Sequence, residues 1–420
     1  MNPTDSLSTN SFTCKICWNT NYNSILNLGA IYPSNFIKSG QEIVSPVPLH
    51  LVECAKCGLV QLKEVVSLDD MYRQYWYRSG INPSMVQALK NIVDSIKSRV
   101  ELSKDDFILD IGCNDGTMLS LYNNDCFKVG FDPALNLREV AKQHCDIFVN
   151  DYFSLDGLFT DKHSIKIFNN RFKVITAIAM LYDLEDPGLF IESVKDLLHK
   201  DGIFVVQFTD LLSMLKCNAF DNICHEHIEY YSLRDLDLLF KTSNMDIFDV
   251  EYNNVNGGSV RVFVCHKGSR KINPRVSKAL VIENDYLESN PPKVFSSRIL
   301  KEKSKLLSII STIKNSNEKI YVLGASTKGN TLLQHYNLTS DLIDCALEIN
   351  KEKFGLRTIG TNIPIIPEEE GLKQKPDYLL CLPWHFRDFF ISRFKDYLLS
   401  GGKLIFPLPS VTVITKEIFK

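Results

Sequence analysis

The stretch that most constrains the fold of this chain runs from Phe107 to Leu119 and reads FILDIGCNDGTML. Apolar residues lead into Asp110, a turn carries Gly112 and Gly116, and apolar residues at helical spacing follow. This pattern predicts a strand, a glycine turn and the start of a helix. Glycine lets a nucleotide-like ligand approach the backbone closely, and the helix N-terminus lies beside that ligand.

A second acidic residue supports a ligand at this turn. Lys128 to Asp132 is predicted to be a short strand ending in a carboxylate, 22 residues after Asp110, where it can hold a ribose diol. The dinucleotide fingerprint G-x-G-x-x-G is absent, and Asp110 suits the cationic methionine end of S-adenosylmethionine (SAM) better than a pyrophosphate. These residues resemble the SAM site of a class I methyltransferase; the alternative is an α/β turn without a ligand. The residues predicted to contact SAM are Asp110, Gly112, Asn114, Gly116, Asp132, Asp151 and Tyr152.

Length and composition limit the class of protein. The 420 residues suffice for two or three domains, and 45% hydrophobic with 23% charged residues is typical of a soluble globular protein. A net charge of −3 provides no basic field, so we expect no nucleic-acid partner. The first ten residues lack the regions of a signal peptide, and no apolar run approaches the ~20 residues that span a bilayer. We therefore expect a cytoplasmic monomer without a membrane partner.

Residues 1–66 carry two matched cysteine pairs. Of 12 cysteines, four form the C-x2-C pairs Cys14/Cys17 and Cys54/Cys57, and the other eight are scattered singly, which favours metal ligands and reduced thiols over disulfides. Two such pairs complete a tetrahedral four-thiolate zinc site. All four positions are filled by protein, so the ion is expected to be structural, in a small β-rich module that packs on another part of the chain. The alternative is four unrelated buried cysteines.

Residues 67–266 are predicted to form a methyltransferase domain. An aromatic segment, Met71 to Gly80, suits either a lid over a ligand or a packed interdomain seam, and a helix from Ser84 to Val100 follows. Strands and helices then alternate, which predicts a parallel sheet. The turn after the third strand faces the adenine in this fold, which makes Asp151 and Tyr152 candidates. The further expected strands are Cys145–Val149, Phe172–Met180, Ile203–Phe208 and Val260–Val264, with helices near Leu137–His144 and Leu189–Leu198.

Just beyond the fifth strand, the chain reads Cys224-His225-Glu226-His227. If this stretch is extended, His225 and His227 share a face and Glu226 points away. An imidazole is a suitable base for an acidified C–H, and a neighbouring carboxylate would orient it. A surface histidine pair and a second metal site are the alternatives, although no further metal ligand is evident. Gly257 and Gly258 form either a hairpin turn or part of the cleft floor.

Residues 267–315 are interpreted as a linker that is helical around Arg298 to Ile313, and residues 316–420 as a Rossmann-like domain. The turn Ala325 to Thr331 follows an apolar strand, opens a helix and carries Lys328, a combination that suits a phosphate. A role in packing alone is the alternative. Three more strands are expected at Ile343–Glu348, Asp377–Leu382 and Lys403–Phe406, and the second of these is followed by His385 and Arg387.

The order of these modules resembles that of the sugar C-methyltransferases, which act on nucleotide-linked 4-keto deoxysugars. The resemblance is carried by the paired C-x2-C module, by C-H-E-H-x-E-Y-Y-S after the SAM domain's fifth strand, and by the C-terminal G-A-S-x-K-G-N-T. It implies structural zinc, a class I SAM domain, and a nucleotide-diphosphate sugar between the catalytic and C-terminal domains. Better-known members have tyrosine at Cys224 and histidine at Tyr182.

The family implies a role for each candidate residue. His227, supported by Glu226, would remove the C3 proton of the sugar, and Tyr182, with Tyr77 or His225, would hydrogen-bond the enolate. An O- or N-methyltransferase on the same scaffold is the first alternative, and a zinc-dependent scaffold protein with a vestigial SAM fold is the second. The residues expected to contact the nucleotide sugar are Cys224, Ser326, Lys328, Asn330 and His385.

Overall fold

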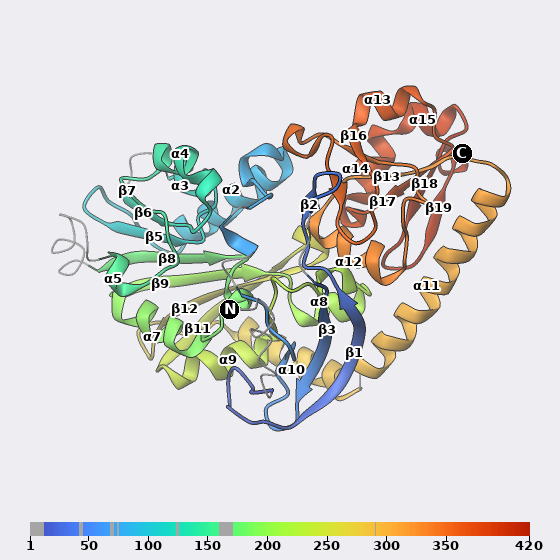
Figure 1. Ribbon diagram of the computed structural model, residues 1–420. Helices are drawn as coiled ribbons and strands as arrows, with labels where there is room; N and C mark the ends of the chain where they lie inside the picture. The colour runs from blue at the N-terminus through green and yellow to red at the C-terminus, as the bar shows by residue number, and fades with distance from the viewer. Residues whose placement is uncertain are drawn as a thin grey trace, which may run out of the picture.

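The computed structural model of the protein describes residues 12–41, 45–67, 71–73, 75–122, 126–158, 171–289 and 291–420. Figure 1 shows a large sheet flanked by helices on the left and a smaller α/β unit at the upper right. The N-terminal strands lie between the lower part of the first unit and the second, and the long helix α11 (Pro291–Asn315) runs up the right-hand side.

The large sheet has the strand order β11-β12-β9-β8-β5-β6-β7. β5, β6, β7, β8 and β9 are parallel neighbours, whereas β12 runs antiparallel to both β9 and β11. All five residues of β5 are buried, which is expected of a central strand covered on both faces. The strands are β5 (Phe107–Ile111), β6 (Phe127–Phe131), β7 (Ile147–Val149), β8 (Phe172–Ile178), β9 (Leu198–Phe208), β11 (Met245–Asn253) and β12 (Ser259–His266).

The prediction of a parallel α/β sheet is confirmed for β5 to β9, whereas the predicted strand at Val260 to Val264 lies in the antiparallel β12. The strand and glycine turn at Phe107 to Gly116 are also confirmed. The helices that cover the sheet begin at residues suited to that position: α2 has Pro83 at its first turn and α9 has a Ser232–Asp235 capping box. The sequence pattern did not predict β11, a strand with buried side chains that pairs with β12. The flanking helices are α2 (Pro83–Lys97), α3 (Thr117–Ser120), α4 (Arg138–Ala141), α7 (Pro187–Leu197), α8 (Leu211–Lys216) and α9 (Leu233–Thr242).

The N-terminal module shares strands with both other units. Its sheet runs β1 (Tyr22–Ile31), β3 (Val47–Cys54) and β4 (Val60–Leu62), and continues into β10 (Glu229–Tyr230), which follows the Cys224–His227 stretch. A further strand, β2 (Phe36–Ile37), pairs with β15 (Arg357–Thr358) of the C-terminal unit. Figure 1 shows β2 beside that unit. Backbone pairing therefore ties the module to both sides of the molecule.

The C-terminal unit contains a six-stranded sheet in the order β16-β14-β13-β17-β18-β19, with only β19 antiparallel. The linker forms two helices, α10 (Pro274–Glu288) and α11, and α11 begins before the predicted Arg298 because proline is tolerated in a first turn. The strands are β13 (Ile320–Leu323), β14 (Ala346–Glu348), β16 (Ile365–Pro367), β17 (Tyr378–Cys381), β18 (Lys403–Phe406) and β19 (Thr412–Ile414), and the helices are α12 (Thr327–His335), α13 (Glu368–Lys373), α14 (Arg387–Arg393) and α15 (Lys395–Leu399).

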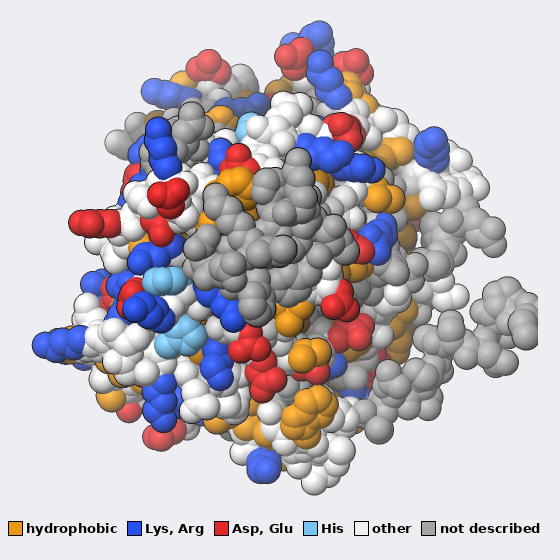
Figure 2. All heavy atoms as spheres, turned by 90° about the vertical axis from the view of Figure 1, so that its left-hand side faces the viewer, with side chains coloured by type: hydrophobic (Ala, Val, Ile, Leu, Met, Phe, Trp, Pro, Cys, Tyr) orange, Lys and Arg blue, Asp and Glu red, His pale blue; other side chains and the backbone are white. Residues whose placement is uncertain are grey.

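The hydrophobic core is continuous across the module, α11 and the C-terminal sheet. Leu51 of the module, Phe295 of α11 and Val322 of β13 are each fully buried in one cluster. The surface is mixed in charge: Figure 2 shows basic and acidic side chains interspersed on the face at the left of Figure 1. Among the described residues, none of the helices is both long enough and apolar enough to cross a membrane.

The shared core predicts a contrast between two neighbouring residues of α11. Phe295→Ala removes a ring that is 0% exposed, and it should lower the free energy of unfolding by about 3–5 kcal/mol. Val294→Ala changes a side chain that is 48% exposed and should cost less than about 0.5 kcal/mol. Urea denaturation measures both values, and equal losses would contradict the continuous core.

Candidate functional site

A cavity of about 280 Å³ opens at the carboxyl ends of the parallel strands. Its walls come from several regions distant in sequence, which include the ends of β5, β6, β8 and β9, the aromatic segment, α2 and the first turn of α12. This is the edge where doubly wound sheets bind ligands. Predicted residues in the lining are Tyr77, Asp110, Gly112, Asn114, Asp132, Asp151, Tyr152, Tyr182, His227 and Lys328.

The glycine turn leaves space that side chains would fill. Gly112 has a φ of +74°, and an added Cβ would lie 3.2 Å from Met180 Cγ. Gly116, with a φ of +77°, leaves only 3.1 Å between an added Cβ and the carbonyl oxygen of Ala141. Both positions therefore require glycine. Gly112 lines the cavity, whereas the space at Gly116 is taken by the neighbouring segment around Ala141.

Two of the carboxyl groups that line the cavity, those of Asp110 and Asp132, are buried. Asp110 accepts a hydrogen bond from Thr176 Oγ1 at 2.7 Å, and burial raises its pKa to about 7. Burial also raises the pKa of Asp132 to about 6, although its oxygens accept from the backbone N–H groups of Ala134 and Asn114. A cation or a pair of hydroxyl groups would stabilise the ionised forms. The α-ammonium and ribose diol of SAM are groups of these kinds, so the residues fit the cofactor.

The aromatic segment is attached to the glycine turn. Asn114 Oδ1 accepts from Ser79 N at 3.0 Å, while Asn114 Nδ2 donates to the carbonyl oxygen of Tyr77 at 3.1 Å. Trp76 faces the other way: its Nε1 donates to Asn35 Oδ1, and its ring packs edge-on against Phe36. The segment is thus both a wall of the ligand cavity and an interdomain seam, which were the two alternatives from composition.

Asp151 and Tyr152 follow β7 in the chain and line the cavity. Arg73 of the aromatic segment forms an ion pair with Asp151 at 3.1 Å and lies 4.9 Å above the Tyr152 ring. The segment therefore contacts the predicted adenine side as well as the glycine turn.

His227 is held as a neutral imidazole that lines the cavity. Its Nδ1 lies 2.8 Å from the carbonyl oxygen of Asn222, which can only accept, so Nδ1 carries the proton and Nε2 has a free lone pair. Burial, followed by the charge of Lys328, lowers the pKa of His227 to about 3. The Tyr182 ring packs edge-on against the imidazole, with centroids 4.4 Å apart.

The H-E-H stretch is a turn, in which the His227 N–H donates to the carbonyl oxygen of Cys224 at 3.1 Å. The extended arrangement considered from sequence is therefore wrong. His225 turns away and donates from Nε2 to the Val47 carbonyl of the N-terminal module. Side-chain atoms of Cys224, Glu226 and His227 instead converge within 4.8 Å of one another, a geometry that a metal ion would also accept. The pKa of Glu226 is raised to about 7 by burial.

Lys328 reaches across from the C-terminal unit into this cluster. Its ammonium donates to Asn222 Oδ1 at 2.6 Å, and burial lowers its pKa. Two other residues expected to bind the nucleotide have partners within the protein: the Ser326 hydroxyl accepts from Gly329 N as the cap of α12, and Asn330 donates to the Asn35 carbonyl. His385 packs between aromatic rings, and burial lowers its pKa to about 3.

The four predicted zinc ligands come together in the N-terminal module. The Sγ atoms of Cys14 and Cys57 are 3.5 Å apart, as are those of Cys17 and Cys54. A tetrahedral zinc ion with bonds of about 2.3 Å separates its sulfur ligands by roughly 3.8 Å, so the four thiolates fit. Asn19 Nδ2 and the Lys56 N–H point at Cys54 Sγ, as donors that support a thiolate do.

Comparisons with known proteins agree with this geometry. Residues 14–72 match the family "Putative zinc binding domain", residues 87–250 "Methyltransferase domain", and residues 254–409 "C-methyltransferase C-terminal domain". The C-methyltransferase NovU of Streptomyces niveus is 27% identical over 413 residues, which are 96% of this chain and 97% of NovU. The chain is a SAM-dependent methyltransferase, similar to the C-methyltransferase NovU over nearly its whole length.

The solved structures to which this methyltransferase is similar cover less of the chain. The N-methyltransferase NodS of Bradyrhizobium japonicum WM9 has a TM-score of 0.33 and 15% identity, covering 44% of this chain and 98% of NodS. Magnesium protoporphyrin IX methyltransferase of Synechocystis PCC 6803, solved with bound SAM, has a TM-score of 0.31 and 11% identity, covering 44% and 79%.

Several cavity residues of the methyltransferase were not selected from sequence. Asp183 follows Tyr182, and burial raises its pKa well above the usual range. Asn222 orients both His227 and Lys328, while Gln207 and Thr327 also line the cavity. Isolated polar residues of these types carry no motif, so only their positions in the folded chain single them out.

Loss of one zinc ligand should release the metal. Cys57→Ser is expected to reduce zinc from about one ion per chain to less than half of that, and to lower the melting temperature, because three ligands bind much more weakly than four. Cys217→Ser, which changes a partly buried cysteine outside the cluster, should retain the metal. Elemental analysis after gel filtration gives the stoichiometry, and equal loss in both variants would contradict the assignment.

The raised pKa of Asp110 predicts the sign of a pH effect on cofactor binding. The carboxyl is partly protonated at pH 6, and a ligand ammonium favours the ionised form, so binding releases a proton. The affinity for S-adenosylhomocysteine should therefore increase from pH 6 to pH 8, as measured by calorimetry. Asp110→Asn should bind roughly tenfold more weakly at pH 8 and lose most of this dependence. An unchanged pH profile in the variant would contradict the contact.

Proposed function

We propose that this enzyme methylates C3 of a nucleotide-linked 4-keto-6-deoxysugar, in the biosynthesis of branched deoxysugars. The observation that carries the proposal is the hydrogen bond from His227 Nδ1 to the Asn222 carbonyl, which leaves the Nε2 lone pair as a base at the cavity wall. A C-methylation needs such a base, because carbon must lose a proton before it attacks a methyl group.

The ketone at C4 acidifies the C3 proton of the acceptor. His227 Nε2 accepts this proton, and the electrons of the C–H bond move toward the carbonyl oxygen to form an enolate. When bound, SAM would supply the electrophilic methyl group for C3, and the electron pair of the broken S–CH3 bond would leave on the sulfur of S-adenosylhomocysteine. The depressed pKa of His227 keeps the imidazole unprotonated at neutral pH, so its Nε2 lone pair is available.

The enolate oxygen is stabilised by groups around His227. The hydroxyl groups of Tyr182 and Tyr77 serve as donors, since both side chains line the cavity. Lys328, which lines the cavity, places a positive charge beside the acceptor. It also forms one edge of the nucleotide-diphosphate site. Preorganised donors of this kind are usually the largest contribution to a step in which negative charge develops.

An O- or N-methyltransferase is the alternative on the same scaffold. It also uses a base, but it does not form a carbanion next to a ketone. The two reactions differ in one observable: only C-methylation predicts that the enzyme exchanges the C3 proton of the keto-sugar with solvent deuterium when S-adenosylhomocysteine replaces SAM. Proton NMR of the recovered sugar detects this exchange.

His227→Ala should reduce kcat for methylation by roughly 10²- to 10⁴-fold and abolish the C3 exchange, because the base is removed. His225→Asn should lose much less, since His225 contacts the Val47 carbonyl outside the lining of the cavity. The affinity for S-adenosylhomocysteine serves as a folding control in both variants. Methylation by His227→Ala near the wild-type rate would show that another group is the base.

A further inference from the structure

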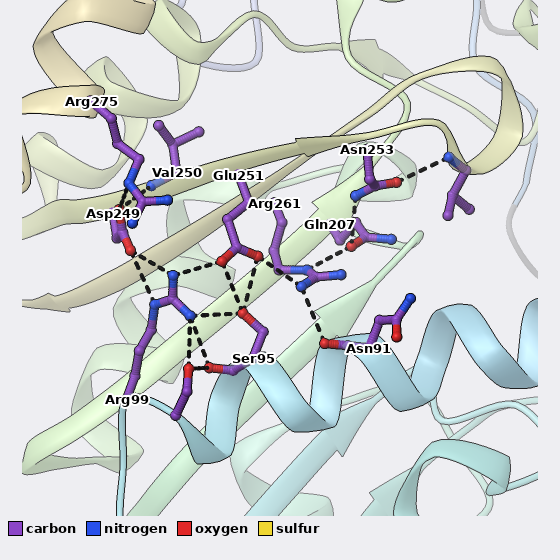
Figure 3. A network of polar contacts seen from close by, with 12 residues as sticks. Asn91, Ser95, Arg99, Gln207, Asp249, Val250, Glu251, Asn253, Arg261 and Arg275 are labelled. Atoms are coloured by element: carbon purple, nitrogen blue, oxygen red, sulfur yellow. Dashed lines mark hydrogen bonds and ion pairs between the residues drawn. The ribbon is translucent and has the colours of Figure 1, made fainter.

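A chain of paired charges leads from the surface of the large sheet to the cavity. Arg275 contacts Asp249, which pairs with Arg99 at 2.7 Å; Arg99 also contacts Glu251, which pairs with Arg261 at 2.9 Å. Figure 3 shows these side chains lying between α2 and the strands β11 and β12. The mechanism proposed above uses none of them.

The network ends on Gln207 and sets the orientation of its amide. Arg261 Nε donates to Gln207 Oε1 at 2.7 Å, and Asn253 Nδ2 donates to the same oxygen at 3.2 Å. A guanidinium can only donate, so the oxygen of Gln207 must face Arg261. Asn253 is oriented independently, because its Oδ1 accepts from Val255 N. In Figure 3 the Gln207 nitrogen points away from both donors.

That nitrogen lies on the cofactor side of the sheet. Gln207 is only 4% exposed but lines the cavity, and since its oxygen is turned into the network, the nitrogen is the atom left to face the ligand. Asp110 pairs across the sheet with Thr176, and Thr176 with Val205, two residues before Gln207. Side chains two residues apart share a face of a sheet, so Gln207 and Asp110 lie on one face.

The charge of the network suits an anion. Three guanidinium groups (Arg99, Arg261 and Arg275) face two carboxylates (Asp249 and Glu251), which leaves one positive charge in excess. A cation at the oxygen of an amide polarises it and makes its N–H groups stronger donors. Gln207 lines the same cavity as Ala88 and Leu89 of α2. Its amide N–H groups thus lie on the face of the sheet where Asp110 is placed to hold an ammonium.

We propose that the Gln207 amide donates to the α-carboxylate of the methionine part of SAM, opposite the ammonium that Asp110 holds. Gln207 is thus a binding residue for the methyl donor, and the Arg261–Glu251–Arg99 chain positions it. This inference concerns the donor alone and does not depend on which atom of the acceptor is methylated.

Two ligands that differ by one group test the contact in the full-length, zinc-loaded protein. S-adenosylhomocysteine carries both the ammonium and the carboxylate, and S-adenosyl-3-thiopropylamine is the same molecule without the carboxylate. Calorimetry should show that Gln207→Ala binds the first roughly tenfold or more weakly than wild type, as expected for a lost hydrogen bond to a charged group. The affinity for the second should stay within about twofold.

Gln207→Glu is the sharper variant, because it keeps an oxygen for Arg261 and Asn253 but replaces the donor with a carboxylate. It should weaken S-adenosylhomocysteine further than Gln207→Ala does, and bind the amine analogue at least as tightly as wild type. Melting without ligand checks the fold of both variants. Equal losses for the two ligands, or unchanged S-adenosylhomocysteine binding together with a raised KM for the acceptor, would overturn the proposal and place the amide elsewhere.

Discussion

The position of His227 depends on one pair of backbone hydrogen bonds. The next residue, Ile228, donates its N–H to the Tyr182 carbonyl after β8, and its carbonyl accepts from Leu62 N of the zinc module, each at 2.8 Å. His227 is therefore held between the large sheet and a strand whose neighbour, β3, ends at the zinc ligand Cys54. A structural metal in the N-terminal module can thus influence the cavity, because it stabilises the strand that holds the residue after His227.

Burial of charge is the second theme of the site. Asp110, Asp132 and Glu226 all have raised pKa values because they lie in a low-dielectric cavity, and His227 has a lowered pKa for the same reason. Such groups cost free energy in the unliganded protein. Ligands that carry an ammonium or a diol relieve that cost at the buried aspartates, so the same electrostatics that destabilise the empty cavity favour binding.

Local patterns predicted the parts of the site that are local in the chain. The glycine turn after β5 and the paired cysteines depend on short spacings, so their geometry follows from neighbouring residues. The Cys224–His227 stretch was identified by composition, but its turn could not be predicted, because His225 is oriented by Val47, far away in sequence. Asn330 was predicted to contact the nucleotide sugar, but its side chain donates to the carbonyl of Asn35, a partner that is also far away in sequence. The monomeric state, the cytoplasmic location and the domain boundaries stay predictions.

The sequence by itself determined the class of sheet, the zinc ligands and the methyl donor, because strand periodicity, glycine turns and cysteine spacing act over a few residues. Only the tertiary structure decided which polar side chains meet in the cavity. Lys328 reaches His227 through Asn222, and Gln207 is turned by Arg261, across strands that pair at long range. Orientation of a side chain is set by the donors and acceptors packed around it, and these come from segments that only folding brings together.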